Sequence, residues 1–254
     1  MRQLSTVFGL LFLTILVHST AVGQESDRKT LDATRVPKEA ARVEDFVPKG
    51  WTIHHRAVGD LNGDYLDDVA LILFDLTRAT EPSMLVDHPQ PALVIAFATE
   101  QGRWRLAGIN TRLIVADDSG FRPLRLEITK GVVVVHQELQ SNISENTLDY
   151  AYTYRFRYDA QTHRFLLIGE DNANTHRDAV DDGIRVSDNY VTGQRVITLM
   201  HAAHGKYVRE TNRSRSIERR TIFLENADEG EDIDFETLRD EFSRPESHKR
   251  PAKP

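Results

Sequence analysis

The amino-acid sequence predicts a mainly β protein: an antiparallel meander that forms a curled sheet, an open barrel or a sandwich, with one short N-terminal helix. Runs of strand length recur along the chain, and turns that contain glycine separate several of them. Because the turns are short, consecutive strands are expected to pair as antiparallel hairpins. The sequence shows no repeat of fixed period, which argues against a complete propeller or solenoid.

Roughly ten strands are expected from residue 51 onward. Val69–Phe74 and Ala92–Ala98 are continuous apolar runs, which is typical of strands buried on both faces. Tyr150–Tyr158 alternates instead, with aromatic residues on one face and arginines on the other. The expected strands are Trp51–Ala57, Val69–Phe74, Ala92–Ala98, Trp104–Ile109, Leu124–Ile128, Val132–Leu139, Tyr150–Tyr158, Phe165–Gly169, Ile184–Val191 and Gln194–Met200, with Tyr207–Thr211 and Arg219–Leu224 as a candidate last pair.

The one expected helix is Pro37–Phe46. Proline is well placed at a first helical position, and apolar residues such as Ala40, Val43 and Phe46 follow at helical spacing. Four regions are therefore expected. They are a signal peptide (1–23), a flexible lead-in (24–36), a single β-rich domain (37–225) and a mobile tail (226–254) that is first acidic and then rich in proline and basic residues.

The N-terminus has the pattern of a secretory signal. Val7–Val17 is an apolar run of 11 residues, and the small residues Ala21 and Gly23 precede the expected cleavage point at Gln24. A helix of that length is too short to cross the roughly 30 Å of hydrocarbon in a bilayer. The sequence therefore predicts a periplasmic or secreted protein without a membrane span.

The composition excludes several functional classes. The chain of 254 residues contains no cysteine, which excludes disulfides, cysteine-ligated metals and a cysteine nucleophile. The net charge of −7 argues against a nucleic-acid partner, because nucleic-acid binders usually carry a basic excess.

One motif carries recognisable chemistry. Side-chain oxygens fall at Asp60, Asn62, Asp64 and Asp68, which are positions 1, 3, 5 and 9 of a loop, and the Leu66 carbonyl occupies position 7. Calcium prefers six to eight oxygen ligands, and a loop that coils around the ion turns alternate side chains inward. Because position 12 is Leu71 in an apolar run, the loop is not an EF-hand.

Residues 58–70, VGDLNGDYLDDVA, resemble the calcium loop of FG-GAP/VCBS-type repeats, the blades of integrin-α-like propellers. The resemblance implies a loop between two strands, with Asp60, Asn62, Asp64 and Asp68 as calcium ligands. The chain departs from the pattern in two ways. Tyr65 replaces the usual glycine, and the motif occurs once, whereas a propeller needs about four blades or more. Other segments, among them Phe46–Trp51 and Asn189–Gly193, resemble uncharacterised exported bacterial proteins that carry a single such loop.

Other interpretations remain open at this stage. The loop can also be a metal-free turn, because Asp, Asn and Gly are preferred turn residues. His54 and His55 should face opposite sides of a strand, while His201 and His204 could share a metal only on a helix. The aromatic stripe of Tyr150–Tyr158 could stack on sugars, but period-2 aromatics favour core packing.

We therefore expect an exported, non-enzymatic binding or structural protein with a structural calcium ion in the 60–68 loop. Its partner is expected to be an extracytoplasmic protein or a glycan. The alternative is a secreted or periplasmic hydrolase whose site is not visible as a motif. A deep pocket with convergent histidine and carboxylate groups would favour the hydrolase, and a shallow aromatic surface would favour the binding protein.

Overall fold

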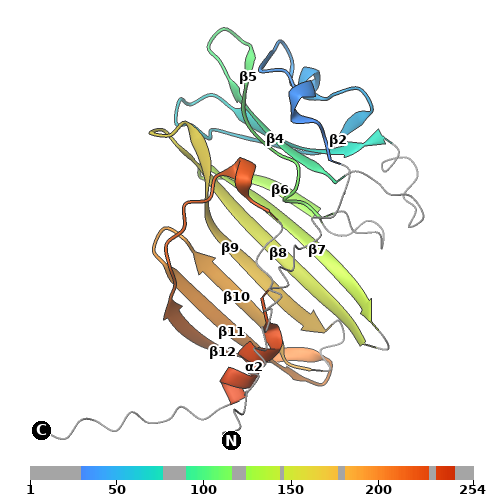
Figure 1. The fold of residues 1–254 in the computed structure, drawn as a ribbon, viewed down its shortest axis with the longest axis vertical. Coiled ribbons are helices and arrows are strands. Elements are labelled where there is room, and N and C mark those ends of the chain that lie inside the picture. The colour runs from blue at the N-terminus through green and yellow to red at the C-terminus, as the bar shows by residue number, and fades with distance from the viewer. Residues whose placement is uncertain are drawn as a thin grey trace, which may run out of the picture.

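A computed structural model describes residues 30–76, 90–115, 124–143, 146–176, 181–228 and 233–243. Two antiparallel sheets dominate this part of the chain (Figure 1). The predicted mainly β class is therefore confirmed. Because the two sheets pack face to face over a shared core, the sandwich is the closest of the three forms that the sequence allowed. The predicted signal peptide, residues 1–23, lies outside the described residues.

The first sheet has five strands in the order β1-β5-β4-β3-β2. Its central strands β3 and β4 are almost wholly buried, because one face meets the second sheet and the other face meets the N-terminal segment. This explains why both strands are continuous apolar runs. The strands are β1 (Glu39–Ala40), β2 (Trp51–Gly59), β3 (Asp68–Asp75), β4 (Ala92–Ala98) and β5 (Trp104–Asn110).

The N-terminal segment packs on the first sheet and differs from its prediction. The expected helix Pro37–Phe46 does not form: β1 pairs with β5, and only the 3-10 turn η2 (Val43–Phe46) follows. The segment pairs with β5 instead of forming a helix, and the hydrogen bond from the Leu106 N–H to the Lys38 carbonyl, 2.8 Å long, supports this pairing. The predicted lead-in is also partly ordered, since Leu31 and Val36 are buried around the 3-10 turn η1 (Ala33–Arg35). Residues 24–29 lie outside the described part.

The second sheet is a meander of seven strands in the order β12-β11-β10-β9-β8-β7-β6. Each strand pairs with its sequence neighbour, as the short turns predicted. β7, β8 and β9 are longer than predicted: β7 and β9 continue past their predicted ends, and β8 begins before its predicted start. The strands are β6 (Leu124–Thr129), β7 (Val132–Ile143), β8 (Asn146–Asp159), β9 (Arg164–His176), β10 (Gly183–Asn189), β11 (Gln194–Ala203) and β12 (Lys206–Ser216).

The last predicted strand, Arg219–Leu224, is not a strand of either sheet. β12 continues along β11 as far as Ser216, past its predicted end at Thr211. The chain after it touches β9 through the bond from the Leu167 N–H to the Ile222 carbonyl, 2.9 Å long, and then forms the 3-10 turn η3 (Leu224–Asn226).

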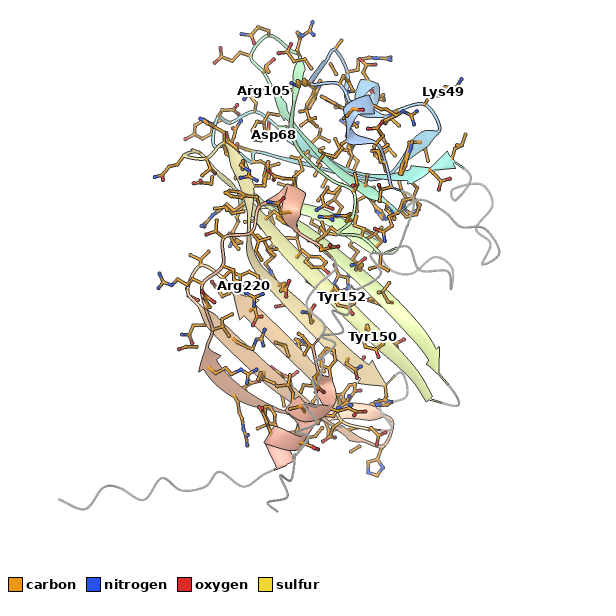
Figure 2. The ribbon with its side chains drawn as sticks, viewed as in Figure 1. Lys49, Asp68, Arg105, Tyr150, Tyr152 and Arg220 are labelled. Carbon is orange, nitrogen blue, oxygen red and sulfur yellow. The ribbon has the colours of Figure 1, made fainter. Side chains whose placement is uncertain are left out.

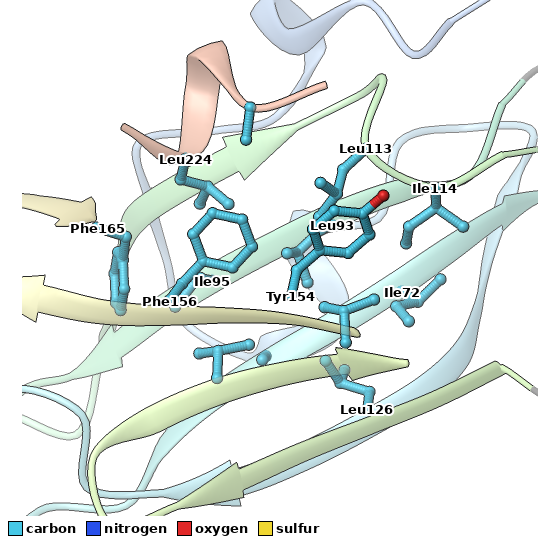
Figure 3. Packing of buried hydrophobic residues seen from close by; sticks show 14 of the residues in the cluster. Ile72, Leu93, Ile95, Leu113, Ile114, Leu126, Tyr154, Phe156, Phe165 and Leu224 are labelled. Atoms are coloured by element: carbon cyan, nitrogen blue, oxygen red, sulfur yellow. The ribbon is translucent and has the colours of Figure 1, made fainter. Parts of the chain in front are cut away.

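The shared core lies between the first sheet and strands β6 to β9 of the second (Figure 3). Ile72, Leu93 and Ile95 face it from the first sheet, and Tyr154 and Phe156 face it from β8. Core packing is therefore confirmed for the middle of the aromatic stripe. The outer residues of the stripe, Tyr152 and Tyr158, are only partly buried against the same cluster.

Part of the predicted mobile tail is ordered, which corrects the expectation for 226–254. Helix α2 (Phe235–Ser243) packs on the second sheet, where Leu238 meets Ile184, Val186 and Ile197 (Figure 1). Asp234 accepts the Thr237 N–H at 2.9 Å, which fastens the first turn of the helix. Residues 244–254 lie outside the described part. In the described chain, no helix combines the length and the apolar character needed to cross a membrane.

Candidate functional site

The candidate metal loop connects β2 to β3. Gly59 at the end of β2 pairs with Asp68 at the start of β3, so residues 60–67 close an antiparallel hairpin. The loop base is tightly packed: a Cβ on Gly59 would lie 2.8 Å from Ile128 Cγ2 of β6. The loop is therefore fixed to both sheets at its base.

Alternate side chains of the loop hydrogen-bond its own backbone. Each bond joins a carboxylate or amide oxygen to an N–H a few residues ahead, which is the arrangement of consecutive Asx turns. The bonds are Asp60 Oδ1 to Gly63 N (2.7 Å), Asp60 Oδ2 to Tyr65 N (3.0 Å), Asn62 Oδ1 to Asp64 N (2.9 Å) and Asp64 Oδ1 to Leu66 N (2.8 Å). The side chains at loop positions 1, 3 and 5 thus hold the coil of the loop.

Tyr65 adopts the backbone conformation of the glycine that it replaces. Its φ is 66°, in the left-handed region, and its side chain is 94% exposed. That conformation costs an L-residue about 1–2 kcal/mol. With no packing of its side chain to offset this cost, the hydrogen bonds of the loop must hold the residue there.

Asp68 is the only one of the predicted ligands that is fully buried. Its Oδ2 accepts the Leu61 N–H and its Oδ1 accepts the Ala98 N–H, both at 2.9 Å, so the carboxylate joins the loop to the end of β4. Burial raises the pKa of Asp68 to about 6, although the two N–H bonds oppose the shift. The charged neighbours that shift this pKa, Asp64 and Asp60, are both acidic and raise it further.

These residues suit a hard divalent cation chemically, but they are not gathered around one point. Within the described residues, no three histidine, aspartate or glutamate side chains are close enough together to hold a metal. A carboxylate oxygen has two lone pairs, so it can accept an N–H and still bind a cation. A cation would also offset the acidic surroundings of Asp68. The ligand set Asp60, Asn62, Asp64, Asp68 and the Leu66 carbonyl stays a prediction.

The histidine pairs differ from their predictions. A β-bulge between Ile53 and His55 turns the rings of His54 and His55 toward each other, with centroids 4.6 Å apart, although a regular strand would separate them. His201 lies in β11 while His204 lies in the following turn, with φ 53°. A helical pair at 201 and 204 is therefore excluded.

One constellation was missed by the sequence analysis. His201 Nδ1 lies 3.0 Å from Asp182 Oδ2, and His201 Nε2 lies 3.1 Å from Thr211 Oγ1. Asp182 also accepts the Ala202 N–H at 2.8 Å. The three side chains come from around β10, β11 and β12, and only the strand register brings them together.

Comparisons with known proteins add no assignment. The chain matches no protein-family model, no curated protein and no solved structure.

The raised pKa of Asp68 predicts a pH dependence of stability in metal-free protein. Between about pH 4 and pH 6 the folded state binds a proton that the unfolded state has lost, so the contribution of Asp68 to stability falls as pH rises. Asp68→Asn should remove this dependence. The measurement is the free energy of unfolding of both proteins in urea, with chelator present. As the pH rises from about 4 to about 6, wild type should lose stability relative to the variant.

With excess calcium, the stability difference between wild type and the variant should no longer change with pH in this window. The reason is that a bound cation lowers the pKa of its carboxylate ligands. A pH-independent difference in chelator would contradict the assigned burial of the Asp68 charge.

Proposed function

We propose that the 60–68 loop binds one calcium ion as a structural cofactor, in an exported protein that acts as a binding or structural module and not as an enzyme. The observation that carries this proposal is Asp68: a buried carboxylate with acidic neighbours that bridges the loop to β4. A buried negative charge of this kind is costly unless a cation or strong hydrogen bonds compensate it.

A structural role suits the position of the loop better than a catalytic one. A calcium ion held by Asp60, Asn62, Asp64, the Leu66 carbonyl and Asp68 would have protein oxygens on most sides, which leaves little room for a substrate. It would link β2, β3 and, through Asp68, β4. Ion binding to the folded state alone stabilises it by mass action, so stability would follow the calcium level outside the cytoplasm.

The proposed setting follows from the N-terminal sequence. Residues 1–23 have the three-part plan of a signal peptide, which supports a periplasmic or secreted location. An extracytoplasmic protein or a glycan is accordingly the proposed partner.

Thermal unfolding tests the calcium proposal. A calcium concentration about 100-fold above the dissociation constant adds about 2.7 kcal/mol, which corresponds to a rise of roughly 5–10 °C in the melting temperature Tm of a chain of this size. Asp60→Ala/Asp64→Ala should abolish the rise, measured against chelator by differential scanning calorimetry. Asp67→Ala is the matched control, because Asp67 is exposed in the same loop but is not in the predicted ligand set. An equal rise in the double variant, or none in wild type, would refute the proposal.

A hydrolase is the second candidate, favoured by one observation. With its proton on Nδ1 facing Asp182, His201 Nε2 can accept the hydroxyl proton of Thr211, which is the order of groups in a nucleophile–base–carboxylate triad. The same groups also satisfy one another as ordinary cross-strand hydrogen bonds.

An ester hydrolysis assay distinguishes a catalytic triad from ordinary cross-strand hydrogen bonds. On the binding-protein proposal, wild type, His201→Ala and Thr211→Val hydrolyse p-nitrophenyl acetate at the same background rate. His204→Asn in the neighbouring turn is the control, since asparagine tolerates positive φ. A wild-type rate above background that both site variants lose and the control keeps would replace the proposal with the hydrolase.

A further inference from the structure

A pocket lies at the opposite edge of the first sheet from the 60–68 loop. Its volume is about 500 Å³, which is within the usual range for small-molecule sites. β5 forms one wall, and the start of β9 and the turn η3 form another; Figure 1 shows η3 between the two sheets. Pockets at the junction of two packed layers are common ligand sites.

The pocket has an apolar floor. Leu106 and Ile109 line it from β5, and Phe165 and Leu224 line it from β9 and η3. Phe165 and Leu224 are almost fully buried in the shared core, so they form a rigid back to the pocket, and the partly exposed Leu106 and Ile109 supply the apolar surface that a ligand can reach. Gly108 permits this arrangement, because a Cβ there would lie 2.7 Å from Leu224 Cδ2. An apolar group that enters the pocket would meet preformed walls.

The rim is basic although the chain is acidic overall. Lys38, Arg105 and Arg164 line the pocket, against Glu39 and Glu225. Both carboxylates are engaged: Glu225 pairs with Arg164, which also lies 3.3 Å from the centre of the Phe223 ring, and Glu39 lies 3.9 Å from Arg103.

Two cationic side chains at this rim, Lys38 and Arg105, have no carboxylate partner among the described residues. Figure 2 shows Arg105 beside the first sheet, and its guanidinium lies 6.0 Å from the centre of the Phe97 ring. In a chain with a net charge of −7, two such cations above an apolar floor favour an anionic ligand.

We propose that this pocket binds a small amphipathic organic anion, whose carboxylate meets Lys38 and Arg105 while its apolar body lies on the partly exposed Leu106 and Ile109. The inference deepens the proposed binding role and uses none of the residues of the calcium loop. Lysine and arginine bind carboxylates through charge-assisted hydrogen bonds, and the preformed apolar walls supply the remaining affinity.

The edge of β5 is too restricted for an added peptide strand. β1 and the Lys38 carbonyl occupy one end of this edge. At the other end, the Asn110 side chain donates to the carbonyls of Leu224 at 2.6 Å and Ala227 at 2.7 Å, which draws η3 across the strand. Only a short stretch of β5 faces the pocket between them. Strand addition needs a continuous open edge, so the site suits a small molecule better.

Fluorescence titration with 8-anilinonaphthalene-1-sulfonate, an aromatic anion, tests the proposal. Wild type should bind the dye saturably, and decanoate should displace it whereas the neutral decanol at the same concentration should not. Lys38→Glu/Arg105→Glu should weaken binding by at least about tenfold, because the loss of a single charge-assisted hydrogen bond is worth about that factor and the variant removes two and adds two repelling charges. Both residues are exposed, so these changes should leave the circular dichroism spectrum and Tm intact.

The control is Lys206→Glu/Arg209→Glu, which reverses two exposed charges on β12, away from the pocket. It should leave the dye affinity within about twofold, because distant surface charges are screened by salt. Unchanged affinity in the pocket variant, displacement by decanol equal to that by decanoate, or the absence of saturable binding would overturn the proposal. Titrations with calcium and with chelator should agree, so failure of the calcium site would not affect this result.

Discussion

The buried carboxylate of Asp68 is the constraint on which the account of the 60–68 loop depends. One of its oxygens binds the loop through the Leu61 N–H, and the other binds the end of β4 through the Ala98 N–H. These bonds fasten the loop to the first sheet, but they leave a negative charge in a buried and acidic setting. Hydrogen bonds compensate part of that cost, and a divalent cation would compensate more of it.

The two proposed sites use opposite edges of one sheet. The loop joins β2 to β3, whereas the pocket lies along β5, and β4 stands between β3 and β5. Because β3 and β4 have packed layers on both faces, this part of the sheet is rigid. A calcium ion would stabilise the sheet that carries the pocket without contacting the ligand, and the two binding events can therefore be measured separately.

The sequence predicted those features that depend on local pattern. Apolar runs located β3 and β4 almost to the residue, and the Asp/Asn spacing located the loop and its unusual residue, Tyr65. The extensions of β7 to β9 were missed, because residues such as Glu170, Asn172 and Asn174 are polar yet buried, and composition alone does not indicate a strand there.

Features that depend on register or on distant packing could not be read from the chain. The bulge at His54 and the approach of Asp182 to His201 arise from strand pairing. Helix α2 was hidden in an acidic segment, where only a few apolar residues, Leu238 among them, mark the face that meets the sheet. The pocket combines residues from four separate elements, so no local sequence motif predicts it.

A crystal structure of the protein grown with calcium would show the proposed ion site itself. We expect an ion at the 60–68 loop, with oxygens of Asp60, Asn62, Asp64 and Asp68 and the Leu66 carbonyl at about 2.3–2.6 Å from it. The side chains would turn toward the ion while Asp68 kept its bonds to the Leu61 and Ala98 N–H groups. A loop that retained only its backbone bonds, with no ion within that distance at saturating calcium, would contradict the account and leave a metal-free Asx turn.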